Sequence, residues 1–153
     1  MKSFLKQFSA DTFKVIEKWF SIGIRNWAHT DVTCGELIYP MLQIGIIDIS
    51  YLESWRSAEN KFQRRAVPVA IIKILKTNPD FKPFFTLIEP LMMDPEREVH
   101  QGLGWFLREA WKINRDETEK FLLKWKDKSP RLIFQHACEK MTKEGKLRFK
   151  KEK

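Results

Sequence analysis

Apolar residues recur three and four positions apart along almost the entire chain, and this spacing constrains the fold more than any other feature of the sequence. It is the spacing of one face of an α-helix, whereas a half-buried strand needs a two-residue alternation, which no run of the sequence sustains. Glycine is scarce, and the Asn-Gly and Asp-Gly pairs that favour β-hairpins do not occur. The sequence therefore predicts an all-α protein.

Capping residues and prolines set the expected helix boundaries. Asp, Ser and Asn recur near the expected helix starts, where their side chains accept hydrogen bonds from free backbone N–H groups. Pro83 is acceptable in a first helical turn, but Pro68 falls inside an expected helix and must kink it or shift its start. The expected helices cover residues 11–20, 24–29, 31–44, 50–57, 60–76, 80–92, 96–112, 116–126 and 130–141.

Three segments align as repeats: FQRRA (62–66), EVHQG (98–102) and IFQHA (133–137). Their small residues Ala66, Gly102 and Ala137 lie 36 and 35 positions apart, and each precedes an apolar helical run. This period suits helix–turn–helix repeats in which a small residue lets neighbouring helices approach. We therefore predict a HEAT-like α-solenoid of antiparallel helix pairs with a concave binding face, an ordinary helical bundle being the alternative. The expected domain covers residues 1–142, and a basic C-terminal tail covers residues 143–153.

The charge of the chain favours a polyanionic partner. The formal net charge is +8 at pH 7, and seven Lys and Arg against two Glu occur from Lys140 onward. That basic segment either contacts phosphates without specificity or is a solvated tail.

Cysteine usage and hydropathy indicate the cellular setting. Cys34 and Cys138 have no second thiol nearby in the sequence, so we expect two reduced core thiols. The apolar runs are shorter than a membrane span, and the first residues lack a signal-peptide core. The sequence predicts a cytoplasmic protein with no membrane association.

Two short motifs contain candidate functional residues. In NWAHTD, Trp27 and Asp31 are four positions apart, so a helical path puts both on one face. Taken alone, Asp31 is better explained as the N-cap of the following helix, although one residue can serve both purposes. In QRRAV, Arg64 and Arg65 are adjacent near an expected helix start, where they either meet phosphate or form a solvent-facing pair.

A third motif, GLGWFLREAWK, places two glycines beside Trp105. Gly102 and Gly104 each cost a helix about 1 kcal/mol relative to Ala. Close helix packing explains them, and so does room for a ligand backbone next to Trp105. Arg108 and Glu109 are expected to be a structural pair bridging repeats rather than a catalytic dyad.

The remaining aromatic and imidazole residues suggest no separate chemistry. Four of the six tryptophans are expected in the core: Trp19, Trp55, Trp111 and Trp125. Three histidines are isolated, without the spacing of a metal site: His29, His100 and His136. No metal and no cofactor is expected.

Taken together, WAHTD, WRSAENKFQRRAV and DPEREVHQGLGWFLREA resemble the DNA alkylation repair enzyme family, the AlkD-like HEAT-repeat DNA glycosylases. The resemblance runs from about residue 10 to the end of the last expected helix. It implies a solenoid whose concave basic face binds duplex DNA. It also implies base excision repair of cationic N-alkylated purines such as 3-methyladenine and 7-methylguanine. Members usually have further N-terminal repeats, so this chain is expected to lack part of them.

The resemblance also implies roles for matching residues. Trp27 and Trp105 match the aromatic pair that contacts the lesion-bearing nucleotide, and Asp31 matches the catalytic carboxylate. Arg65 matches the arginine at the DNA backbone. The expected partner is duplex DNA with alkylated bases, bound by a monomer.

Two other functions remain open from the sequence. A non-catalytic DNA-binding HEAT-repeat module would bind in a salt-sensitive manner without excising bases. A protein-interaction solenoid would use its positive charge for solubility alone.

Overall fold

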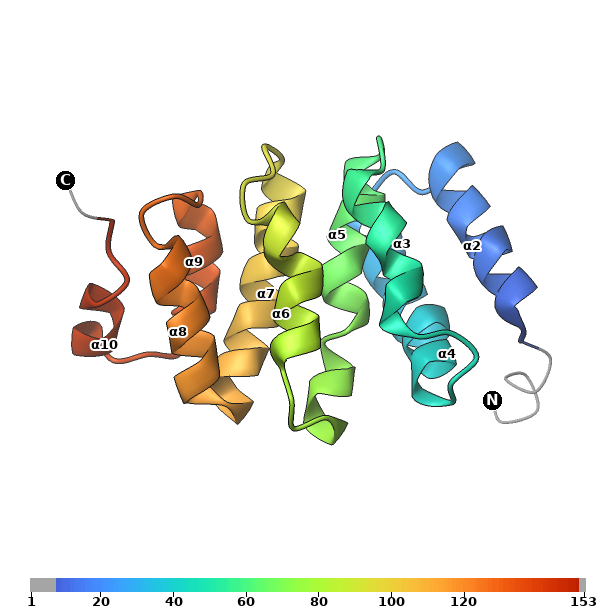
Figure 1. Cartoon of the computed structure of the whole chain (residues 1–153). Helices are drawn as coiled ribbons and strands as arrows, with labels where there is room; N and C mark the ends of the chain where they lie inside the picture. Colours follow the sequence, from blue (N-terminus) through green and yellow to red (C-terminus); the bar gives the residue numbers. More distant parts are fainter. Residues whose placement is uncertain (1–7, 152–153) are drawn as a thin grey trace.

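The computed structural model describes residues 8–151, and within that range every regular element is helical. Residues 1–7 of the expected domain and 152–153 of the expected tail lie outside the described residues. Figure 1 shows the helices standing side by side in a row that follows chain order from α2 to α10. The predicted all-α class and solenoid-like arrangement are confirmed.

Successive helices are joined by short connections. The α-helices are α2 (Ala10–Ile22), α3 (Trp27–Thr33), α4 (Tyr39–Gln43), α5 (Lys61–Ala70), α6 (Lys82–Ile88), α7 (Arg97–Ile113), α8 (Arg115–Trp125), α9 (Arg131–Ala137) and α10 (Lys143–Leu147). A π-helix, η1 (Cys34–Ile38), joins α3 to α4. The 3₁₀ segments are η2 (Ile49–Ser57), η3 (Lys73–Thr77) and η4 (Glu89–Leu91).

Every second α-helix from α3 to α9 packs on the next helix of that series. Thus α3 packs on α5, α5 on α7 and α7 on α9, while η2 contacts α5 and α6. The aligned small residues Ala66, Gly102 and Ala137 are buried on α5, α7 and α9. The sequence alignment therefore identified the three helices that stack on one another.

Aromatic side chains link the outer helices to the core. The ring of Trp55 stacks on Phe13 at 5.1 Å between centroids and meets Phe20 edge-on at 5.0 Å. Such pairs add attraction beyond the burial of their area. Trp55 and Trp111 are buried as expected and Trp125 is half-buried, but the core assignment of Trp19 is wrong.

The helix containing Asp31 begins earlier than expected. Asn26 caps α3, since its Oδ1 accepts a hydrogen bond from the backbone N–H of His29 at 2.8 Å. The segments 24–29 and 31–44 therefore merge into one helical run from α3 through η1 to α4. The N-cap interpretation of Asp31 is wrong, because Asp31 lies inside α3.

The expected single helix 60–76 is divided after Pro68. The proline ring has no N–H to donate, and α5 ends two residues later at Ala70. A 3₁₀ segment, η3, follows. The helix is thus interrupted where the sequence placed a kink.

The basic segment after residue 142 packs on the domain in part. It forms α10, and the side chain of Phe149 is fully buried. Arg131 Nη1 donates to the carbonyl of Phe149 at 2.9 Å, and Arg148 pairs with Glu119 at 2.9 Å.

Candidate functional site

A bidentate ion pair joins Asp31 on α3 to Arg65 on α5. Arg65 Nε donates to Asp31 Oδ1 at 3.0 Å, and Nη2 donates to Oδ2 at 2.9 Å. The third nitrogen, Nη1, donates to the carbonyl of Glu98 at 2.9 Å. Only 7% of the Arg65 side chain and 16% of the Asp31 side chain are exposed. The guanidinium therefore fixes the carboxylate while one edge of that carboxylate still meets solvent.

Trp27 lies one helical turn before Asp31. It is the first residue of α3 and is 60% exposed. An exposed indole of this size contributes nothing to the core, so its surface is available to a partner. Trp27 and Asp31 thus share α3, which confirms the helical path between them, although they were expected in the separate helices 24–29 and 31–44.

A hollow of about 280 Å³ opens beside Asp31. The π-helix η1 lines it through Cys34, Gly35 and Glu36, and Trp105 of α7 also lines it. A π-turn inserts an extra residue and is frequent at functional sites. The hollow thus brings Asp31 and Trp105 together from elements far apart in the sequence.

The glycines of α7 determine where Trp105 points. A Cβ on Gly102 would lie 3.1 Å from Arg65 Cγ, toward α5. A Cβ on Gly104 would lie 2.5 Å from the Cβ of a residue of α9. Leu103 and Phe106 are fully buried on the core side. Because an α-helix turns about 100° per residue, Trp105 projects to the remaining side. Close packing therefore accounts for both glycines.

Arg64 does not join this group. Its Nε donates to Asp94 Oδ2 at 2.7 Å, and Nη1 donates to the carbonyls of Ala58 and Glu59 at 2.8 and 3.0 Å. Asp94 in turn accepts from the backbone N–H of Glu96. Arg64 ties the start of α5 to the start of α7, so neither arginine faces solvent as a free pair.

Arg108 bridges neighbouring repeats as expected. Its Nη1 donates to Glu139 Oε2 at 2.7 Å, beyond the end of α9, and Nη2 lies 3.6 Å from Glu109.

Most residues of the hollow were not among the sequence candidates, and two of them, Lys73 and Tyr39, contact each other. Lys73 and Tyr39 both line it, and Lys73 Nζ lies 5.6 Å from the centre of the Tyr39 ring. Lys73 is exposed and makes no ion pair within residues 8–151. Its position eight residues after Arg65 was a usable signal, since this is about two helical turns. The interruption at Pro68 obscured it.

Two buried or partly buried groups near Asp31 are held in one protonation state. Burial raises the pKa of the Cys34 thiol far above its usual value, the Asp31 carboxylate adds to this, and the thiol stays neutral. Desolvation works to raise the pKa of Glu98, but its backbone N–H and Lys61 outweigh it, and the pKa is lowered. Cys34 is therefore no nucleophile, and Glu98 remains an anion that pairs with Lys61 at 3.1 Å. Both cysteines are free and buried, as expected.

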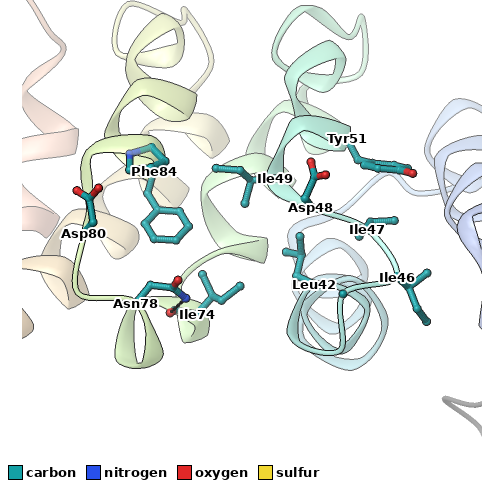
Figure 2. Close-up of a pocket in the computed structure, with 12 residues that line it drawn as sticks. Leu42, Ile46, Ile47, Asp48, Ile49, Tyr51, Ile74, Asn78, Asp80 and Phe84 are labelled. Atoms are coloured by element: carbon teal, nitrogen blue, oxygen red, sulfur yellow. Dashed lines mark hydrogen bonds between the residues drawn. The ribbon is translucent and has the colours of Figure 1, made fainter.

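Several further hollows lie apart from the Asp31–Arg65 pair, and two of them have volumes of about 560 and 440 Å³. Figure 2 shows the larger one, of about 560 Å³, between the loop after α4 and the start of α6. Its carboxylates, Asp48 and Asp80, accept backbone hydrogen bonds as local caps. The other, of about 440 Å³, includes Trp19, which is 42% exposed, and shares Val32 with the hollow beside Asp31. Trp19 is exposed because it borders this open hollow, which α3 residues His29, Val32 and Thr33 line from the other helix.

Fold and site together define a helical-repeat protein in which a carboxylate, an exposed indole, a half-buried indole and a buried arginine lie on α3, α5 and α7. The model of the family described as DNA alkylation repair enzyme matches residues 1–141 of the sequence. The chain belongs to this family. Among curated protein sequences, none gives a significant match.

Among the helices of residues 8–151, none has the length and apolar character of a membrane span. Within residues 8–151, no group of three or more His, Cys, Asp or Glu side chains is placed to hold a metal ion.

Proposed function

We propose that this protein is a DNA glycosylase that excises cationic N-alkylated purines, of the 3-methyladenine and 7-methylguanine type, from duplex DNA. The observation that carries the proposal is the Asp31 carboxylate, which Arg65 fixes beside two indoles of neighbouring elements. Trp27 is exposed one turn away on the same helix, and the half-buried Trp105 lines the same hollow as Asp31. Membership of the DNA alkylation repair family supports a damaged-DNA substrate.

The chemistry of this substrate suits the residues present. Alkylation gives the base a positive charge, so it leaves as a neutral purine without a strong general acid. The sugar left behind develops oxocarbenium character as the glycosidic bond lengthens. A carboxylate near the anomeric carbon stabilises that charge and orients the attacking water. An indole face adds about 0.5–2 kcal/mol of attraction for a cation.

In this scheme Arg65 acts through Asp31. Three of its N–H groups are already bonded to Asp31 and Glu98, and the side chain is nearly inaccessible. We therefore propose that Arg65 orients the Asp31 carboxylate. This role replaces the contact with the DNA backbone that the family resemblance implied for Arg65. Phosphate contacts then fall to exposed cations, among them Lys73 and Arg97.

In our proposal, the damaged nucleotide is recognised in an open hollow and not in an enclosed pocket. The space beside Asp31 is about 280 Å³ and is separated from the neighbouring apolar hollow by Val32, which lines both. Enzymes that extrude a base enclose it in a fitted pocket. An open hollow instead favours a lesion that stays in the stack while Trp27 and Trp105 contact the damaged nucleotide.

Base release under single-turnover conditions tests the proposal. The substrate is a duplex oligonucleotide with one 7-methylguanine, and released base is measured alongside duplex affinity. Asp31→Asn is expected to lower the excision rate by about 10²–10³-fold, the loss typical of one electrostatic stabiliser, with duplex affinity retained. The matched control is Asp116→Asn, an exposed carboxylate on α8, which should excise like the wild type.

The outcomes separate the proposed enzyme from the other candidates. No base release at high enzyme excess overturns the glycosylase. Salt-sensitive duplex binding without release identifies a non-catalytic DNA-binding module, because neutralised phosphates release counterions. Absence of binding at low salt leaves the protein-interaction solenoid.

A further inference from the structure

The side chain of Arg65 lies across α7 at two points. Its Nη1 donates to the carbonyl of Glu98, in the first turn of α7, at 2.9 Å. One turn further on, Arg65 Cγ and the Arg65 carbonyl lie 3.1 and 3.4 Å from the place where a Cβ of Gly102 would stand. The aliphatic stem of Arg65 therefore occupies the space that any side chain at position 102 would need.

Arg65 has little freedom to move out of that space. Its guanidinium is bonded on three nitrogens, two of them to Asp31, and it is buried between α5 and α7. Val69 Cγ2, at 3.4 Å from the same Cβ position, bounds the space on the far side. A methyl group at residue 102 would displace the Arg65 stem by a few tenths of an ångström and strain its present rotamer, and the guanidinium would move with it.

Glycine inside a helix lowers helix stability relative to alanine, so its presence calls for a compensating gain. Here the gain is the space that Gly102 leaves for the aliphatic stem of Arg65. We infer that Gly102 is a positioning residue: it seats Arg65 so that the guanidinium holds the Asp31 carboxylate in its reactive orientation. The effect of this inference on catalysis rests on the proposed function, but the packing of the Arg65 stem on Gly102 is a property of the free protein.

Two measurements on Gly102→Ala test the inference. The first is hydrogen exchange of the Arg65 Nε–H signal by NMR in the free protein, assigned by its loss in Arg65→Lys. The bond to Asp31 should slow this exchange in the wild type, and Gly102→Ala should accelerate it about tenfold, the factor expected when a side chain is forced off its rotamer. The second is the single-turnover excision rate, which should fall by a similar factor while duplex affinity stays constant.

Two controls make the result specific. Gly23→Ala is the matched substitution, since its Cβ would meet nothing closer than 3.7 Å, and it should leave both measurements unchanged. In an Arg65→Lys background, Gly102→Ala should cause no additional loss of rate, because no guanidinium remains to be displaced.

The inference is overturned if Gly102→Ala leaves the Arg65 exchange rate at its wild-type value, or lowers the rate equally with and without Arg65. If the wild type releases no base, the proposed function fails, yet the exchange measurement still decides whether Gly102 seats Arg65. If Gly102→Ala does not fold, Gly102→Ser, whose side chain begins at the same Cβ, replaces it. Failure of both to fold overturns a role confined to positioning.

Discussion

Removing Arg65 is the sharpest perturbation of the site. Arg65→Ala takes away two charge-assisted hydrogen bonds to Asp31 and one to the Glu98 carbonyl. Breaking a buried pair by deleting one partner costs about 3–5 kcal/mol. Asp31 keeps 16% exposure and can be rehydrated in part, so the lower end applies. We expect a loss of about 3 kcal/mol, a fall in Tm of roughly 6–12 °C for a domain of this size.

Urea denaturation of a double-mutant cycle measures this coupling. The losses in unfolding free energy of Arg65→Ala and Asp31→Ala should differ in sum from that of the double variant by about 1–3 kcal/mol. Each single change leaves the other charged group without its partner. Lys61→Ala is the comparison, since its pair with Glu98 is more exposed and should contribute less than about 1 kcal/mol. If the two changes at Asp31 and Arg65 add within about 0.5 kcal/mol, the ion pair does not organise this site.

Three further predictions concern other parts of the chain. Gly104→Ala should destabilise the protein by about 1–2 kcal/mol in urea denaturation. Its Cβ would stand 2.5 Å from a Cβ of α9, so overpacking near the upper end of the usual range, about 2–3 kcal/mol, exceeds the gain of about 1 kcal/mol in helix propensity; equal or higher stability contradicts the packing. The Trp111 indole N–H and Arg148 lower the pKa of Glu119 below its usual 4.5. The stability that this carboxylate contributes should therefore be intact above pH 4.5 and decline as the pH falls through the folded-state pKa. Glu119→Gln should flatten that decline, and identical pH profiles of the variant and the wild type contradict the prediction. The buried Cys34 thiol should react with a disulfide reagent only upon unfolding, and rapid reaction in native buffer would rule out its burial.

The sequence located most of the site because its residues follow simple periodicities. Trp27 and Asp31 are one helical turn apart, and the repeat alignment placed Arg65 and Trp105 on consecutive inner helices. These relations depend only on helix geometry and on a repeat of constant length. No periodicity shows that Arg65 is buried, because burial depends on how closely α7 approaches α5, which Gly102 determines.

Other expectations failed where local signals compete. Asn26 and Asp31 are both good capping residues, and the sequence cannot show that Asn26 takes the cap while Asp31 bonds to an arginine from another helix. Trp19 has the spacing of a core residue, but no neighbouring helix covers it in the described structure. Arg64 differs from Arg65 by one position, or about 100° around the helix, and so meets Asp94 instead. In each case, contacts with other helices, or their absence, determined the environment of the side chain.

The contact chain from Asp31 through Arg65 to the Glu98 carbonyl crosses two interfaces between successive helix pairs. In a stacked array each unit is stabilised by its neighbours, and its ends can open before its middle. This contact chain consequently exists only in molecules in which α3, α5 and α7 are folded at the same time. Fraying at the N-terminal end would break it while leaving α8 and α9 intact, so the integrity of the Asp31–Arg65 pair is also a measure of the folding cooperativity of the chain.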